Sequence, residues 1–137
     1  MKTIFSLLLI SLLLSCDRAP KPFPLEKLTG YWEIEKVVFA EGEEKLYKIN
    51  ETIDYIYVKD SAGFRKKVMP QFNGTYLENG DLETVKVRGK DGRTFLDYQT
   101  PYTKRSEEIS ELTTDKLVVK LDGAEYHYKK PIPFSVK

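Results

Sequence analysis

The residue types that most often carry catalysis are scarce in this sequence, which has one histidine and one cysteine among 137 residues. A Ser-His-Asp relay could be built only around His127, and strand alternation puts that side chain opposite Tyr126 and Tyr128, on the face expected to meet solvent. One His and one Cys are too few to hold zinc. We therefore expect a protein that is not an enzyme and uses no metal or cofactor. Two carboxylate pairs are interpreted as solvated faces: Glu33 with Glu35, and Glu107 with Glu108.

Charge gives no indication of a nucleic-acid partner. Lys and Arg number 22 and Asp and Glu number 21, so the formal net charge is +1. The basic residues form no stripe along the chain. Proteins that bind nucleic acid nonspecifically show a clustered positive patch, so nucleic acid is not expected as a partner.

The single cysteine, Cys16, directly follows an apolar run. Lys2 precedes residues 4–14, about 11 mostly apolar residues, which is the length of a signal-peptide core and short of the about 20 that span a membrane. The segment Leu13-Leu14-Ser15-Cys16 resembles the lipobox of bacterial lipoproteins. That resemblance implies cleavage of residues 1–15, thioether attachment of diacylglycerol to Cys16 and acylation of the new amino group.

Two other interpretations of Cys16 are an ordinary signal peptide followed by a free thiol, and a cysteine buried in a core. Lipidation is favoured because no second cysteine is present to form a disulfide, and a free thiol is a liability in an oxidising compartment. Two or three acyl chains, palmitate among them, would anchor the protein firmly to a membrane. We expect it in the bacterial cell envelope, in the outer membrane, on the periplasmic face or at the cell surface. Residues 16–24, rich in proline, are predicted to be an extended tether.

The rest of the chain alternates between short runs rich in Val, Ile, Tyr, Phe and Thr and turn signals such as Asn73-Gly74, Asn79-Gly80, Asp91-Gly92 and Asp122-Gly123. This pattern predicts an all-β meander of about eight or nine antiparallel strands. The phase of alternation changes near Lys36, which predicts a bulge there. Only residues 24–28 suggest a helical turn. Closure into an up-and-down barrel would remove the exposed sheet edges.

The segment Leu28-Thr29-Gly30-Tyr31-Trp32-Glu33-Ile34 resembles the Gly-x-Trp signature of lipocalins, and residues 112–130 resemble the last hairpin of small lipocalin-like lipoproteins of Gram-negative envelopes. The resemblance implies a small barrel over residues 25–130, followed by a tail at 131–137. It also implies that Trp32 plugs the closed end and that Gly30 passes close to a neighbouring segment. A cation of the last strand would lie over the indole, and this chain offers Lys129 or Lys130; we assign Lys129.

The inside of an eight-stranded barrel is either filled by side chains or holds one small ligand. If tyrosine rings point inward, their hydroxyls could bind the polar end of a small apolar ligand. The alternative is a filled barrel that acts as an interaction or structural module and binds another envelope protein. The candidate pocket residues are Tyr55, Tyr57, Tyr76, Tyr98, Tyr126 and Tyr128.

One modification motif is present in a predicted exposed turn. Asp60-Ser61-Ala62 resembles an O-glycosylation motif of some bacterial envelopes, so Ser61 is a candidate for glycosylation. Taken together, the sequence predicts a membrane-anchored, lipocalin-like lipoprotein that binds a small hydrophobic ligand in its barrel, with the filled-barrel module as the alternative.

Overall fold

The computed structural model describes residues 23–132, which form nine β-strands and one short 3₁₀ helix. The predicted signal peptide, Cys16, most of the predicted tether and most of the predicted tail lie outside the described residues. No helix within residues 23–132 is long and apolar enough to cross a membrane. The elements are η1 (Leu25–Leu28), β1 (Gly30–Val38), β2 (Glu44–Leu46), β3 (Ile53–Lys59), β4 (Ala62–Pro70), β5 (Tyr76–Lys90), β6 (Arg93–Gln99), β7 (Lys104–Leu112), β8 (Lys116–Leu121) and β9 (Ala124–Lys129).

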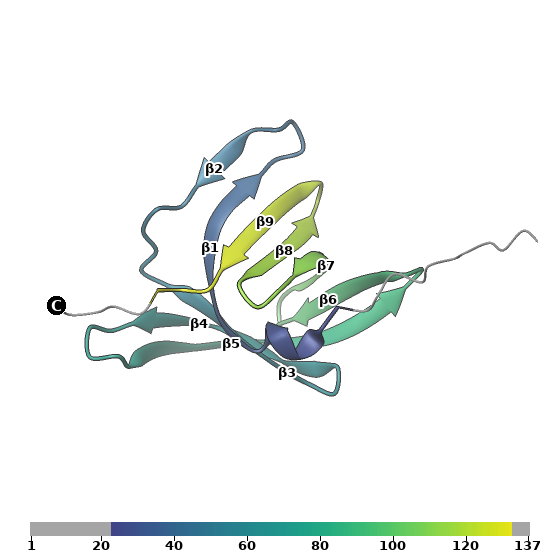
Figure 1. Ribbon diagram of the computed structural model, residues 1–137. Coiled ribbons are helices and arrows are strands. Elements are labelled where there is room, and N and C mark those ends of the chain that lie inside the picture. Colours follow the sequence, from purple (N-terminus) through teal and green to yellow (C-terminus); the bar gives the residue numbers. More distant parts are fainter. Residues whose placement is uncertain (1–22, 133–137) are drawn as a thin grey trace, which may run out of the picture.

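The strands form one antiparallel sheet that closes on itself (Figure 1). From β3 to β9 each strand pairs with the next along the chain, and β1 pairs with both β3 and β9. Eight strands therefore make the barrel, and β2 is an extra strand paired with the end of β1. The predicted all-β meander of eight or nine strands, closed into a lipocalin-like barrel, is confirmed.

Tight turns join the strands at most of the predicted positions, but the turn predicted at Asn79-Gly80 was wrong, because both residues lie within β5 where its register with β4 shifts. Asp91-Gly92 and Asp122-Gly123 have positive φ at both positions, the conformation that two-residue hairpins require. The same is true of Asp60 and Ser61, where the side chains are exposed. Ser61 thus lies in an exposed turn, as expected for a candidate modification site.

The predicted bulge in β1 is present, because the register with β9 shifts between Ile34 and Lys36. After the shift Val37 pairs with Tyr126, whose ring packs against the core, and Val37 is itself buried. The extra residue therefore returns the strand's apolar side chains to the inner face.

The core gathers around Trp32 at the end of the barrel that carries η1. Trp32 is fully buried, and its Nε1 donates a hydrogen bond of 2.9 Å to the carbonyl oxygen of Leu28. Residues from β6, β7 and β8 pack in the same cluster, and Leu25 and Phe23 pack against it. The predicted helical turn is thus part of the core and covers this end of the barrel (Figure 1).

The cation over the indole is Lys130, and the assignment of Lys129 was wrong. Lys130 Nζ lies 3.8 Å from the centroid of the Trp32 ring. Tyr128 points into the core, so strand alternation turns Lys129 outward and Lys130 inward. Gly30 has φ +143°, and a Cβ there would lie 2.7 Å from Lys130 Nζ, which is the close approach that the resemblance implies for this glycine.

Candidate functional site

The six candidate tyrosines lie on two different faces of the sheet. Tyr98 and Tyr128 are buried in the core, and Tyr126 packs against it. The other three lie outside the barrel, so their assignment to an interior pocket was wrong: Tyr55, Tyr57 and Tyr76.

Tyr55 and Tyr57 lie outside the barrel because Ile56 and Val58 of β3 belong to the core and take the inner positions. Tyr55 and Tyr57 alternate with them and therefore point outward. Outside, Tyr55 contacts the rings of Tyr31 and Phe64. Tyr76 stacks on Tyr31 with centroids 4.2 Å apart, so the outer tyrosines form an aromatic surface outside the barrel.

A buried ionic cluster occupies the interior beside the inward tyrosines, which we call the Arg65 cluster. Arg65 in β4 lies between two carboxylates, with Nη2 3.1 Å from Asp54 Oδ2 and Nη1 3.5 Å from Glu107 Oε2. Its guanidinium also donates hydrogen bonds to the hydroxyl oxygens of Tyr98 (3.3 Å) and Tyr128 (3.0 Å). All five side chains are buried. The tyrosine hydroxyls thus bind a residue of the protein itself.

The prediction that Glu107 belongs to a solvated face was wrong. Glu107 pairs across the sheet with Leu96, which is fully buried, so both side chains point into the barrel. Its neighbour Glu108 is oriented outward and pairs with Arg93. Adjacent residues of a strand point to opposite faces, so the two glutamates could not both meet solvent on one face of the sheet. The sequence pattern did not reveal Arg65 as the buried partner of Glu107.

A second set of charges surrounds the Arg65 cluster. Lys67 Nζ lies 2.8 Å from Asp54 Oδ1. Arg105 holds Glu83 through two hydrogen bonds of 2.6 and 2.9 Å, and its Nε lies 3.3 Å from Glu107 Oε1. Three cations therefore face three carboxylates, and the site as a whole is close to neutral.

Burial and charge pairing set the protonation states in the cluster. Burial raises the pKa of Asp54, but the charges and hydrogen bonds of Arg65 and Lys67 outweigh it, so the pKa of this carboxyl is lowered from its ordinary value. Burial opposes the charge of Arg65, yet the facing tyrosines and carboxylates hold its pKa well above the ordinary value. Burial raises the pKa of Tyr98 and Tyr128, so both hydroxyls stay protonated.

A hollow of about 590 Å³ opens above the Arg65 cluster, and we call it the mouth hollow. It includes the β6–β7 turn, which lies at the end of the barrel opposite η1. Asp54 and Arg65 are at its floor, and Tyr102 on its rim is 94% exposed. The remaining lining residues are Lys66, Lys67, Gly80, Asp81, Leu82, Glu83, Thr100, Pro101 and Arg105.

The mouth hollow offers ionic and hydrogen-bonding groups. Within residues 23–132, no three His, Cys, Asp or Glu side chains are grouped so as to hold a metal ion. His127 lies on the outer face of β9, half-buried, with Nε2 3.1 Å from Glu125 Oε2. What the geometry can do is bind a polar group.

Sequence reasoning missed Asp54, Arg65 and Glu107. A signal was present in Ile53-Asp54-Tyr55-Ile56-Tyr57-Val58, because Asp54 alternates in phase with two aliphatic residues that a barrel core needs. Burial of that carboxylate requires a cation on a neighbouring strand, and Arg65 occupies that position.

Comparison with known proteins identifies similar domains. A family model described as the lipocalin-like domain matches residues 28–119. The crystal structure of a lipocalin-like protein from Bacteroides uniformis is 12% identical with a TM-score of 0.48, and the alignment covers 76% of this chain and 98% of that one. An uncharacterized protein from Bacteroides eggerthii is 13% identical, also with a TM-score of 0.48, over 76% and 99% of the two chains. No curated protein matches the chain.

Proposed function

Because the chain belongs to the family of lipocalin-like domains, we propose that it is a lipid-anchored binding protein of the bacterial envelope, and that a small ligand binds in the mouth hollow above Arg65. Members of this family generally bind ligands rather than catalyse reactions. Anchoring through Cys16, location in the outer membrane and ligand binding are all parts of this proposal.

The observation that carries the proposal is the Arg65 cluster beneath an open hollow. Removing charges from water is costly, and a buried ion pair is often no more stable than apolar side chains of similar volume. A gain in stability is therefore a weak explanation for burying an arginine with two carboxylates. Clustered charges at the floor of a hollow are the usual setting of a binding site.

The ligand expected from these charges has a polar end. A purely apolar ligand would meet Lys67 and Arg105 on the hollow's wall and leave them partly desolvated without new partners. A ligand that both donates and accepts hydrogen bonds fits the balanced charges better. Its apolar part would contact Leu82, Pro101 and Tyr102 at the rim.

Native mass spectrometry of the full chain, isolated gently from its own membrane, tests the ligand proposal. We expect an added mass of a few hundred daltons that is lost on denaturation. The double variant Lys67→Ala/Tyr102→Ala should lose the added mass, whereas Lys90→Ala, an exposed lysine at the end of β5 away from the hollow, should keep it. A bare polypeptide mass, repeated after incubation with lipids and small molecules extracted from the host, would contradict ligand binding.

Anchoring has its own test. Cys16→Ala should move the protein from the membrane to the soluble fraction and remove the mass of the acyl chains, because the thioether cannot form. If the variant stays in the membrane and its mass differs from that of the parent only by the substituted atom, the lipid anchor is excluded.

The same intact-mass measurement shows whether Ser61 carries a sugar.

The filled-barrel module remains the second candidate function, and the aromatic surface favours it. Tyr31, Tyr55, Tyr57 and Phe64 form a chain of ring contacts outside the barrel, and aromatic residues are enriched in protein interfaces. A photo-crosslinking residue in place of Tyr57 should then capture one envelope protein reproducibly. The same residue in place of Tyr102 should not.

A further inference from the structure

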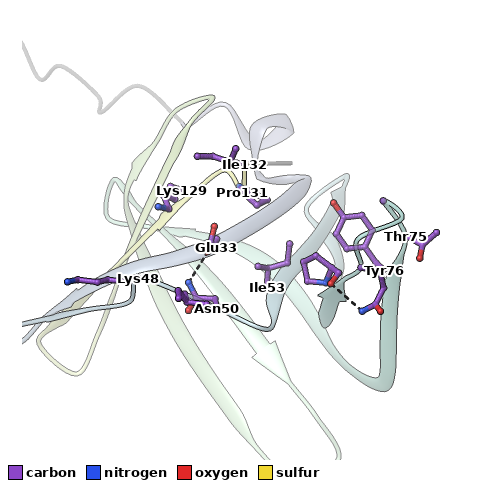
Figure 2. Close-up of a pocket in the computed structure, with 13 residues that line it drawn as sticks. Glu33, Lys48, Asn50, Ile53, Thr75, Tyr76, Lys129, Pro131 and Ile132 are labelled. Atoms are coloured by element: carbon purple, nitrogen blue, oxygen red, sulfur yellow. Dashed lines mark hydrogen bonds between the residues drawn. The ribbon is translucent and has the colours of Figure 1, made fainter. Parts of the chain in front are cut away.

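A second pocket lies outside the barrel, where β1 and β3 separate. β1 pairs with β3 only over Gly30–Trp32 and then with β2 over Lys36–Val38. Residues 47–52 cross the gap between these two pairings. The hairpin turn between β4 and β5 and the segment after β9 complete a pocket of about 410 Å³. We call it the side pocket (Figure 2).

One part of the side pocket is charged. Lys48 comes from the crossing segment and Lys129 from the end of β9. Neither ammonium has an ion-pair partner within residues 23–132. The carboxylate of Glu33 also lines the pocket and in Figure 2 lies nearer to Lys129 than to Lys48. Its Oε1 accepts a hydrogen bond of 3.0 Å from Asn50 Nδ2. Two cations and one anion leave this part of the pocket with a net positive charge.

The remainder of the side pocket is largely apolar. Ile53 forms a buried wall, while Ile49 and Ile132 are 90% and 82% exposed. Figure 2 shows Ile53 and Tyr76 on the side away from Lys48. An occupant would remove these exposed apolar groups from water, at about 25 cal/mol per Å². The apolar wall consists of Ile49, Ile53, Pro70, Tyr76, Pro131 and Ile132.

We propose that the side pocket binds a small amphipathic anion, a monocarboxylate with an unbranched apolar chain. The carboxylate would lie between Lys48 and Lys129, and the chain would cover Ile53, Ile49 and Ile132. A volume of about 410 Å³ is in the range of small-molecule pockets. The side pocket shares no lining residue with the mouth hollow, so this inference goes beyond the proposed function and does not depend on it.

Decanoate is the probe for this proposal, added to the full chain in phospholipid nanodiscs with isoleucine methyl groups labelled for NMR. We expect saturable shifts at Ile49, Ile53 and Ile132. The methyl groups of Ile109, which lies in the core of the barrel, should not move. Empty nanodiscs provide the correction for decanoate that partitions into lipid.

Charge is tested with a matched pair of variants. Lys48→Ala/Lys129→Ala should weaken decanoate binding about 10-fold, since each exposed ion pair contributes up to about 1 kcal/mol. Lys86→Ala/Lys104→Ala, on the outer face of β5 and β7, should bind as the parent does. Both pairs of lysines are at the surface, so neither variant is expected to unfold the barrel.

Decanol and decyltrimethylammonium, which have the same chain without the negative charge, should bind at least 10-fold more weakly. Equal binding of decanol, unchanged affinity of Lys48→Ala/Lys129→Ala, or the absence of saturable shifts at Ile49, Ile53 and Ile132 would each overturn the proposal. Because the readout is specific to residues of the side pocket, a negative result here leaves ligand binding at the mouth hollow to its own test.

Discussion

Trp32 is held by two polar contacts although its side chain is fully buried. The indole Nε1 donates to the carbonyl oxygen of Leu28, and Lys130 lies over the ring face. A buried indole needs a partner for its single donor, and the 3₁₀ helix supplies it. The contact with Lys130 joins the end of the chain's last strand to the beginning of its first.

Lys130→Ala should destabilise the barrel by about 1 kcal/mol, the contribution of a partly desolvated cation over an indole. Lys129→Ala is the control, because that neighbouring side chain points outward and has no contact with Trp32. Urea unfolding followed by the fluorescence of Trp32 gives both values. Equal stability of the two variants would show that the contact contributes nothing.

Asp54 should make the stability depend on pH in the acid range. Its pKa is lowered in the folded protein from the ordinary 3.8, so above that value the carboxylate is ionised in both states and its contacts with Arg65 and Lys67 contribute fully. As the pH falls below 3.8, the unfolded state takes up a proton first, and this stability is lost as the pH passes through the folded pKa.

Asp54→Asn should therefore be about 3 kcal/mol less stable than the parent near neutral pH, because one partner of a buried ion cluster is removed. It should also lose less stability on acidification than the parent does. Urea unfolding at a series of pH values measures both effects. Asp91→Asn, which removes a carboxylate from an exposed turn, should follow the parent; an Asp54 variant that does so too would contradict the role given to the cluster.

At the scale of the element, the β3–β4 hairpin leaves no room for a Cβ at Gly63. A Cβ at Gly63 would lie 1.7 Å from the carbonyl oxygen of Tyr57, and that oxygen belongs to the neighbouring strand backbone. The hairpin also carries Asp54 and Arg65 on its two strands. Close approach of the two backbones therefore helps to set the spacing of the Arg65 cluster.

Gly63→Ala should cost about 1 to 3 kcal/mol, since the two strands must move apart. Gly89→Ala is a matched control in β5, because the nearest atom to a Cβ there is 4.0 Å away; a change within about 0.5 kcal/mol is expected. The melting temperatures of the two variants test this. If Gly63→Ala has the same melting temperature as Gly89→Ala, the close approach does not constrain the hairpin.

At the scale of the whole molecule, closure through β1 and β9 makes the barrel one unit. The first and last strands pair from Glu33 with Lys129 to Val38 with Glu125, so neither end of the meander can separate without breaking this ladder. Core residues come from strands all around the barrel. No part of it has a separate core within the described residues that could remain folded alone.

Unfolding should accordingly be a single transition. The fluorescence of Trp32 reports on the end of the barrel that carries η1, and circular dichroism in the far ultraviolet reports on all strands. The two denaturation curves should coincide. A loss of Trp32 burial at a lower urea concentration than the loss of strand signal would show that η1 and β1 detach first.

Much of this architecture could be predicted from local patterns. Alternation identified the strands, Asp91-Gly92 and Asp122-Gly123 identified hairpins, and the change of phase near Lys36 identified the bulge. These features depend on backbone geometry within a few residues, where residue type is decisive. The roles of Gly30 and Trp32 came from the family resemblance.

The candidate site could not be predicted in the same way, because it depends on which faces of distant strands meet. Alternation divides β3 into two faces, but only barrel closure decided that Tyr55 and Tyr57 are outside and Asp54 is inside. The partner of Asp54 is Arg65 from the next strand, and Glu107 joins them from β7.

The sequence by itself determined the strands, most of their turns and the all-β class, since these follow from the period and conformational preferences of neighbouring residues. Only the tertiary structure decided that Lys130 rather than Lys129 contacts Trp32, that Glu107 is buried, and that a pocket lies where β1 separates from β3. The physical reason is that a charge can be buried only where a distant partner neutralises it, and curvature of the closed sheet determines which distant residues can meet.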